Sequence, residues 1–168
     1  MLIPIRHLGF GLLLACTGPS AQNAAVELTP QQLFAGHSEG HGSLTIFLGK
    51  PQPFHVESLG QLRPDGSFQL DQTVTFEGQP AKDRSWILRT VSPGVYAGTL
   101  SDAVGDVSGR SEGNRLTLRY RIKSLLSMHQ TLELMSDGRT IDNIGKITLL
   151  GIPVGWLDET IVLETPIR

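Results

Sequence analysis

The stretch Arg115-Leu-Thr-Leu-Arg-Tyr-Arg-Ile-Lys123 decides the fold, because its side chains alternate with a period of two. Apolar or aromatic residues stand at the even-numbered positions, and arginine, threonine or lysine stands at the odd-numbered ones. Successive side chains of a β-strand point to opposite faces, so this pattern predicts a half-buried strand. We interpret the basic face as the solvated outside of that strand; the alternative is attraction to anionic lipid head groups.

A second stretch alternates in the same way between residues 68 and 77. One face is expected to carry Phe68, Leu70, Val74 and Phe76, and the other Gln69, Asp71, Thr73, Thr75 and Glu77. Around both stretches, short runs are separated by turn signals such as Pro64-Asp65-Gly66, Ser92-Pro93-Gly94, Glu112-Gly113-Asn114 and Asp137-Gly138. The pattern predicts strands near 41–48, 54–62, 67–77, 84–91, 94–101, 106–111, 115–123, 130–136, 140–149 and 157–164.

One short helix is expected before the strands. Thr29 can cap it, Pro30 suits its first position, Leu33 and Phe34 give it an apolar edge, and Gly36 can end it. No convincing helix follows. Eight to ten antiparallel strands in one small domain favour closure, because a closed sheet has no exposed edge. The sequence therefore predicts an all-β protein, a single antiparallel barrel domain over residues 29–168.

The N-terminus predicts export and a lipid anchor. Arg6 precedes an apolar run, Leu8 to Ala15, which is too short to span a bilayer and ends at Cys16, the only cysteine of the chain. Leu13-Leu14-Ala15-Cys16 has the form of a lipobox. We therefore expect residues 1–15 to be a signal peptide and residues 16–28 a tether lipidated at Cys16, which leaves no thiol for a disulfide or a metal.

The same segment indicates the compartment. Thr17 follows the cysteine where an aspartate would favour the inner membrane, so we expect an outer-membrane lipoprotein on the periplasmic face. The alternative is cleavage near Ala21 to Ala25, which would release a soluble periplasmic protein. The formal net charge of −2 gives no electrostatic reason to expect a nucleic-acid partner. The expected partner is the membrane, through the lipid anchor.

Several motifs carry a resemblance to a known family. They are Phe34-Ala-Gly36, Leu70-Asp71 with Phe76, Arg84 and Trp86, the run Tyr96-Ala-Gly-Thr-Leu-Ser-Asp-Ala-Val-Gly105, then Gly109, Gly113-Asn114 and Tyr120. On these the chain resembles domain-of-unknown-function family 3833, a proteobacterial lipoprotein family, as a divergent member. The family's aspartate-rich segment with a Trp is replaced here by Leu132-Glu-Leu-Met-Ser-Asp137. The resemblance implies a lipocalin-like (calycin) barrel and an envelope location, and no activity.

The candidate ligand-binding residues are Arg84, Trp86, Tyr96, Asp102 and Asn114. In a small barrel, an aromatic side chain supplies contact area, and Arg or Asp can fix a polar head group. A structural role is equally compatible with these residues. Arg84 and Asp102 could form a packed ion pair at a barrel end, and Asn114 could hold a left-handed turn.

Other polar groups of the chain belong to residue types that bind metals or act in catalysis. His37, Glu39 and His41 alternate and would share one strand face, but the glycines between them favour a flexible, solvated strand end, so no metal site is expected. No nucleophile motif or phosphate loop is present, so no catalytic residue and no cofactor are assigned. An enzymatic alternative would use Asp102 or Asp71 as acid or base.

These observations lead to three hypotheses. The first is a lipid-anchored periplasmic barrel that binds a hydrophobic or lipid-like small molecule. The second is an enzyme acting on a lipid-like substrate, which needs a buried carboxylate with a shifted pKa in a deep pocket. The third is a structural envelope lipoprotein with no ligand, whose barrel would be filled by its own side chains.

Overall fold

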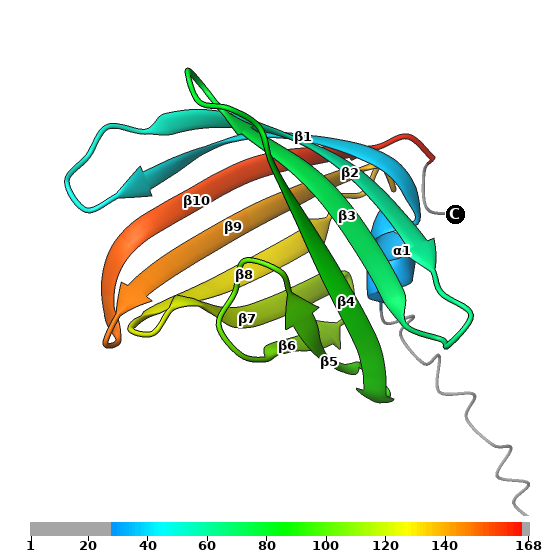
Figure 1. Cartoon of the computed structure of the whole chain (residues 1–168). Coiled ribbons are helices and arrows are strands. Elements are labelled where there is room, and N and C mark those ends of the chain that lie inside the picture. Colours follow the sequence, from blue (N-terminus) through cyan, green and yellow to red (C-terminus); the bar gives the residue numbers. More distant parts are fainter. Residues whose placement is uncertain (1–27, 166–168) are drawn as a thin grey trace, which may run out of the picture.

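The computed structural model describes residues 28–165, which form a closed barrel of ten antiparallel strands (Figure 1). Each strand pairs with its neighbours in sequence, and β1 pairs with β10 to close the sheet. The predicted signal peptide, the lipobox at Cys16 and most of the tether fall outside the described residues. Within residues 28–165, no helix is long and apolar enough to cross a membrane.

The elements follow one another with short connections. In chain order they are α1 (Pro30–Phe34), β1 (Gly36–Ile46), β2 (Gln52–Leu62), β3 (Phe68–Phe76), β4 (Lys82–Ser92), β5 (Val95–Leu100), β6 (Val107–Glu112), β7 (Arg115–Lys123), β8 (Leu126–Leu134), β9 (Thr140–Leu149) and β10 (Ile152–Leu163). The predicted all-β antiparallel barrel with one short N-terminal helix is confirmed, and β7 and β9 have the predicted bounds.

Three predicted strand starts were wrong, because β1, β8 and β10 begin at Gly36, Leu126 and Ile152, four or five residues early. The glycine-rich start of β1 is part of the barrel wall, and it is not the flexible strand end expected from the sequence. At Gly42, the wall is too crowded for a side chain, since a Cβ there would clash with the backbone carbonyl oxygen of Asp158. Glycine is therefore required by packing, and does not mark a loop.

The helix α1 has the predicted caps and covers one end of the barrel. Gln32 N–H donates to Thr29 Oγ1, and the Gln32 side chain accepts from Thr29 N–H, which completes a capping box. Leu33 and Phe34 are buried against the strands. We call this end, with the β2–β3, β4–β5, β6–β7 and β8–β9 turns, the closed end.

The opposite end carries the β1–β2, β3–β4, β5–β6, β7–β8 and β9–β10 connections, and we call it the open end (Figure 1). Between the two ends, the interior follows the alternation expected from the sequence. Phe68, Leu70, Leu116 and Leu118 are buried, while Val74 and Phe76 of β3, near the open end, are only half-buried. The basic side chains of β7 face solvent, as expected for the outer face.

Candidate functional site

A belt of polar side chains crosses the middle of this otherwise apolar interior. Its first part is organised by Gln72 of β3, which is buried. The Oε1 atom of Gln72 accepts from Arg84 Nε at 2.9 Å and from Trp86 Nε1 at 2.8 Å. The Nε2 group of Gln72 donates to Ser58 Oγ at 3.0 Å. One amide therefore fixes both an arginine and a buried tryptophan, whose ring lies 5.7 Å from the guanidinium carbon of Arg84.

The second part of the belt runs from β7 to β10. Tyr120 Oη donates to Gln130 Oε1 at 3.0 Å, Gln130 Nε2 donates to Asn143 Oδ1 at 3.4 Å, and Asn143 Nδ2 donates to Glu159 Oε2 at 2.7 Å. The rings of Trp86 and Tyr120 meet edge to face, with centroids 5.2 Å apart, and so join the two parts. We call these eight side chains, Ser58, Gln72, Arg84, Trp86, Tyr120, Gln130, Asn143 and Glu159, the polar belt.

The belt holds one buried carboxyl group. Burial raises the pKa of Glu159, and the hydrogen bond from Asn143 and the charge of Arg84 oppose that rise only in part. Burial likewise raises the pKa of the Tyr120 hydroxyl to about 12. Burial therefore disfavours the charged form of both groups, and the protonated form of the Glu159 carboxyl can donate as well as accept a hydrogen bond.

A cavity of about 30 Å³ lies against the belt and is more enclosed than the larger hollow described below, so we call it the enclosed cavity. Gln72, Arg84, Trp86, Gln130, Asn143 and Glu159 line one part of it, and Phe34, Phe68, Leu70, Leu88, Leu116, Leu118, Leu132 and Ile161 line the rest. This volume holds one or two water molecules. A larger hollow of about 600 Å³ lies mostly against outward-facing polar side chains of β2–β4, and we regard the enclosed cavity as the candidate site.

The five predicted ligand-binding residues do not form one cluster. Arg84 and Trp86 lie in the belt and line the cavity. Tyr96 is buried in the wall, where it packs against Gly109, and is not among the cavity-lining side chains. Asp102 is exposed in the β5–β6 loop, and Asn114 is exposed in the β6–β7 turn at the closed end.

The structural alternatives for these residues are also corrected. Among the described residues, Arg84 makes no ion pair with Asp102. Gly113, with φ 59°, takes the left-handed conformation of the β6–β7 turn, and Asn114 donates from its side chain to the carbonyl of Leu134 at 3.0 Å. Asp71 lies on the outer face, where it accepts from neighbouring side chains. Neither predicted acid or base therefore faces the cavity.

The histidine-rich strand β1 places its side chains as the alternation indicates. His37, Glu39 and His41 all lie on its exposed face. His41 meets His55 of β2, with 3.3 Å between their Nδ1 atoms. Over residues 28–165, no group of three or more His, Cys, Asp or Glu side chains comes close enough to hold a metal ion.

Sequence reasoning missed most of the polar belt. Gln72, Gln130, Asn143 and Glu159 were not candidates, although each stands in phase with buried apolar neighbours two residues away. A polar residue at an inward position of an alternating strand is the signal that could have found them, because a buried polar group needs a partner. Gln72 stands midway between Leu70 and Val74 and is the clearest case.

The fold and this interior define a lipocalin-like barrel with a polar belt across an apolar core. The chain belongs to the family described as "Protein of unknown function (DUF3833)", whose model matches residues 11–162. This confirms the family that the motifs indicated. No curated protein matches the chain.

Two solved structures share the fold at low sequence identity. The S-type phycobiliprotein lyase CPES from Guillardia theta superposes with a TM-score of 0.62 at 8% identity, covering 78% of this chain and 88% of that one. A protein of unknown function from the DUF3598 family of Nostoc punctiforme gives a TM-score of 0.58 at 15% identity, covering 82% of this chain and 49% of that one. At such identities the likeness establishes the fold alone.

Proposed function

We propose that this protein is a lipid-anchored barrel on the periplasmic face of a bacterial outer membrane that binds one hydrophobic or lipid-like small molecule. The observation that carries this proposal is the two-sided lining of the enclosed cavity. Arg84, Gln72 and Glu159 offer polar contacts on one side, and leucine, isoleucine and phenylalanine side chains surround the rest. Such a lining suits a molecule with an apolar body and one polar end.

Arg84 and Glu159 are the groups that would orient the polar end. A guanidinium has five N–H donors. Within residues 28–165, the Arg84 guanidinium uses one of them, because its only hydrogen bond runs from Nε to Gln72. The two terminal nitrogens of Arg84 suit the two oxygens of a carboxylate or phosphate. A neutral Glu159 would add a donor, so an oxygen-rich head group fits the pair better than an amine.

The cavity volume limits how binding can occur. Pockets for small molecules typically measure about 300–1,000 Å³, so a ligand must displace side chains from the present cavity of about 30 Å³. Met128, next to the belt on β8, is one unbranched side chain that can rearrange. The same small volume favours a second candidate, a structural envelope lipoprotein whose interior stays filled.

The fold neighbours add a weaker argument by analogy. One of them is a phycobiliprotein lyase. Because a lyase uses a barrel of this fold, we extend by analogy to this chain a role in binding an organic molecule. Because one fold supports many functions, the cavity lining and not the neighbour carries the proposal.

Anchoring is proposed from the sequence alone and has its own test. Metabolic labelling with a clickable fatty acid is expected to tag the wild type and leave Cys16→Ser untagged. Equal labelling of both proteins would refute lipidation at Cys16, and a mature N-terminus near residues 21–25 would establish signal-peptide cleavage instead.

Ligand binding is tested by titrating the purified protein with a fluorescent fatty acid. Saturation near one molecule per barrel is expected, with about tenfold weaker binding in Arg84→Ala, because a hydrogen bond to a charged group contributes about 1.5–3 kcal/mol. Arg110→Ala is the matched control, since Arg110 lies on the outer face and is 68% exposed. Absence of saturable binding in the wild type would favour the structural candidate.

A further inference from the structure

The open end of the barrel carries exposed apolar side chains on three neighbouring hairpins. Phe47 and Leu48 at the β1–β2 tip are 57% and 105% exposed, Leu125 at the β7–β8 tip is 55% exposed, and Leu150 and Ile152 at the β9–β10 tip are 75% and 67% exposed. We call these five residues the apolar tips. Side chains of this kind gathered on one end of a molecule mark a surface that contacts something else.

The three hairpins lie side by side. The backbone N–H of Leu150 donates to the carbonyl of Leu125, and the N–H of Phe47 donates to the carbonyl of Val154 on β10. Figure 1 shows these three tips furthest to the left of the view, whereas the β3–β4 connection projects at the top and the β5–β6 connection lies nearer the middle. The apolar tips therefore form one row along one side of the open end.

Two of these residues hold backbone conformations that their side chains disfavour. Phe47 has φ 55° and Leu150 has φ 50°, and they are the two non-glycine residues with positive φ among residues 28–165. Left-handed backbone is unfavourable for residues with a Cβ, and Leu150 stands where asparagine followed by glycine is typical of a two-residue hairpin. Neither the backbone preference of the residue nor burial of its side chain explains why positions 47 and 150 both hold a large apolar residue.

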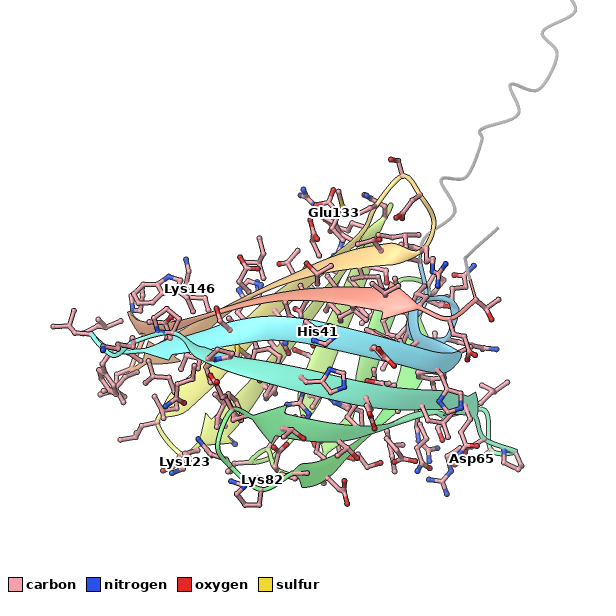
Figure 2. All side chains as sticks on the ribbon, turned by 90° about the horizontal axis from the view of Figure 1, so that it is seen from above. His41, Asp65, Lys82, Lys123, Glu133 and Lys146 are labelled. Carbon is pink, nitrogen blue, oxygen red and sulfur yellow. The ribbon has the colours of Figure 1, made fainter. Side chains whose placement is uncertain are left out.

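The charges around the tips match an anionic surface. The three hairpin segments 43–56, 121–132 and 144–157 contain Lys50, Lys123 and Lys146 and no Asp or Glu. All three lysines are exposed, and Figure 2 labels Lys123 and Lys146 on the two sides of the same end. By contrast, the β3–β4 and β5–β6 connections of the same end carry Glu77, Asp102 and Asp106.

A tryptophan lies just behind the tips. Trp156 on β10 is 48% exposed and pairs across the sheet with Lys146. Tryptophan beside lysine, set back from exposed leucines, is the arrangement found where proteins cross from lipid hydrocarbon to head groups. Separate projecting tips also fit a fluid layer, into which each side chain can insert independently.

We propose that the open end docks onto an anionic lipid bilayer, with the apolar tips inserted at the head-group boundary and the three lysines against lipid phosphates. This contact is independent of the ligand and anchor proposed above, because it lies at the end opposite to α1.

The test measures binding of the full chain carrying Cys16→Ser to sedimented vesicles of phosphatidylethanolamine with and without phosphatidylglycerol. Binding is expected to need phosphatidylglycerol and to fall about tenfold or more in Phe47→Ser/Leu48→Ser, since two large side chains lose their insertion. Leu125→Ser is compared with Leu62→Ser, because both leucines are 55% exposed and Leu62 lies at the closed end. Only Leu125→Ser should weaken binding.

Two further readouts keep the proposal falsifiable. Leu150→Asn suits its turn better than leucine, so a loss of vesicle binding in this variant is not a failure to fold. Vesicles should shift the tryptophan emission to shorter wavelength, and Trp156→Phe should abolish the shift, because Trp86 is already buried. Equal binding of tip and Leu62 variants, an unshifted emission, or a dimer that tip variants dissociate without any vesicle binding would overturn the proposal.

Discussion

The two ends of this barrel use exposed and buried side chains in opposite ways. At the closed end, α1 buries Leu33 completely, and the chain before it is tied across the opening, where Leu28 N–H donates to the carbonyl of Gly113. At the open end, Leu48 is fully exposed, and Leu150 occupies a left-handed turn position. The helix α1 packs over the closed end, where Leu62 and Val91 are nevertheless exposed, whereas the open end presents the apolar tips on three neighbouring hairpins.

The turns show the same contrast in polar groups. At the closed end, Asp137 accepts from the backbone N–H groups of Arg139 and Thr140 and from the Thr140 hydroxyl. In a second closed-end turn, Asp65 accepts a hydrogen bond from the backbone N–H of Ser67 and forms an ion pair with Arg89. Since these carboxylates are used within the fold, the closed-end turns contribute to stability, whereas the apolar tips of the open end are free of such internal contacts and are available to a partner.

The largest expected effect lies between the ends, at Trp86. Trp86→Ala should lower the free energy of unfolding by about 3–5 kcal/mol, because it leaves a large cavity and removes one of the two hydrogen bonds that Gln72 Oε1 accepts. Denaturant unfolding followed by circular dichroism measures the change. A midpoint equal to that of the wild type would mean that the belt does not hold the barrel together.

A matched pair of leucines tests the contrast directly. Leu33→Ala at the closed end should lower the free energy of unfolding by about 2–5 kcal/mol, because Leu33 is fully buried. Leu48→Ala at the open end should change it by less than about 0.5 kcal/mol. The same denaturant series serves both variants, and similar losses in the two would remove the distinction between the ends.

The closed-end turn and the belt should respond to pH with opposite signs. Hydrogen bonds from Thr140 and Arg139 lower the pKa of Asp137 from 3.8 to about 2, so its stabilisation is present above pH 3.8 and is lost as the pH falls towards 2. Burial raises the pKa of Glu159 above 4.5, so its stabilisation is present below pH 4.5 and is lost as the pH rises through the raised pKa.

Thermal unfolding across pH measures both effects. Asp137→Asn should lower the midpoint at neutral pH and match the wild type near pH 2. Glu159→Gln should raise the midpoint at neutral pH, with a gap that closes below pH 4.5. A gap for Glu159→Gln that widens towards low pH would contradict the raised pKa.

The smallest effect is expected at the β9–β10 tip. Leu150→Asn should raise the free energy of unfolding by about 0.5–1 kcal/mol, because asparagine tolerates positive φ better than leucine. Chemical denaturation resolves a change of this size when the transition slope stays constant. A destabilised Leu150→Asn would show that the leucine has a folding role at the open end.

Much of the fold could be predicted from local pattern. The alternation in β3 and β7, the turn glycines and the Thr29 cap each report a local preference, and all were confirmed. The early start of β1 could not be predicted, because Gly42 is required by the backbone of Asp158, which is distant in sequence. Closure between β1 and β10 is likewise a long-range pairing that no local run reveals.

The site was less predictable for a physical reason. Arg84 and Trp86 were found through family motifs, but their common partner Gln72 looks like any surface glutamine until its strand phase is considered. Asp102 matched a motif and is exposed in a loop. A motif reports which residues recur together in a family, whereas burial and partners depend on pairing across the barrel.

Native mass spectrometry of the protein purified from the cells that produce it tests ligand capture most directly. If the polar belt holds a molecule between the closed end and the open end, the wild type should carry one copurifying small molecule per barrel. Arg84→Ala should have lost most of it, and Arg110→Ala should keep it. A wild-type mass equal to that of the polypeptide alone, in gentle detergent, would contradict ligand capture and would favour a barrel filled by its own side chains.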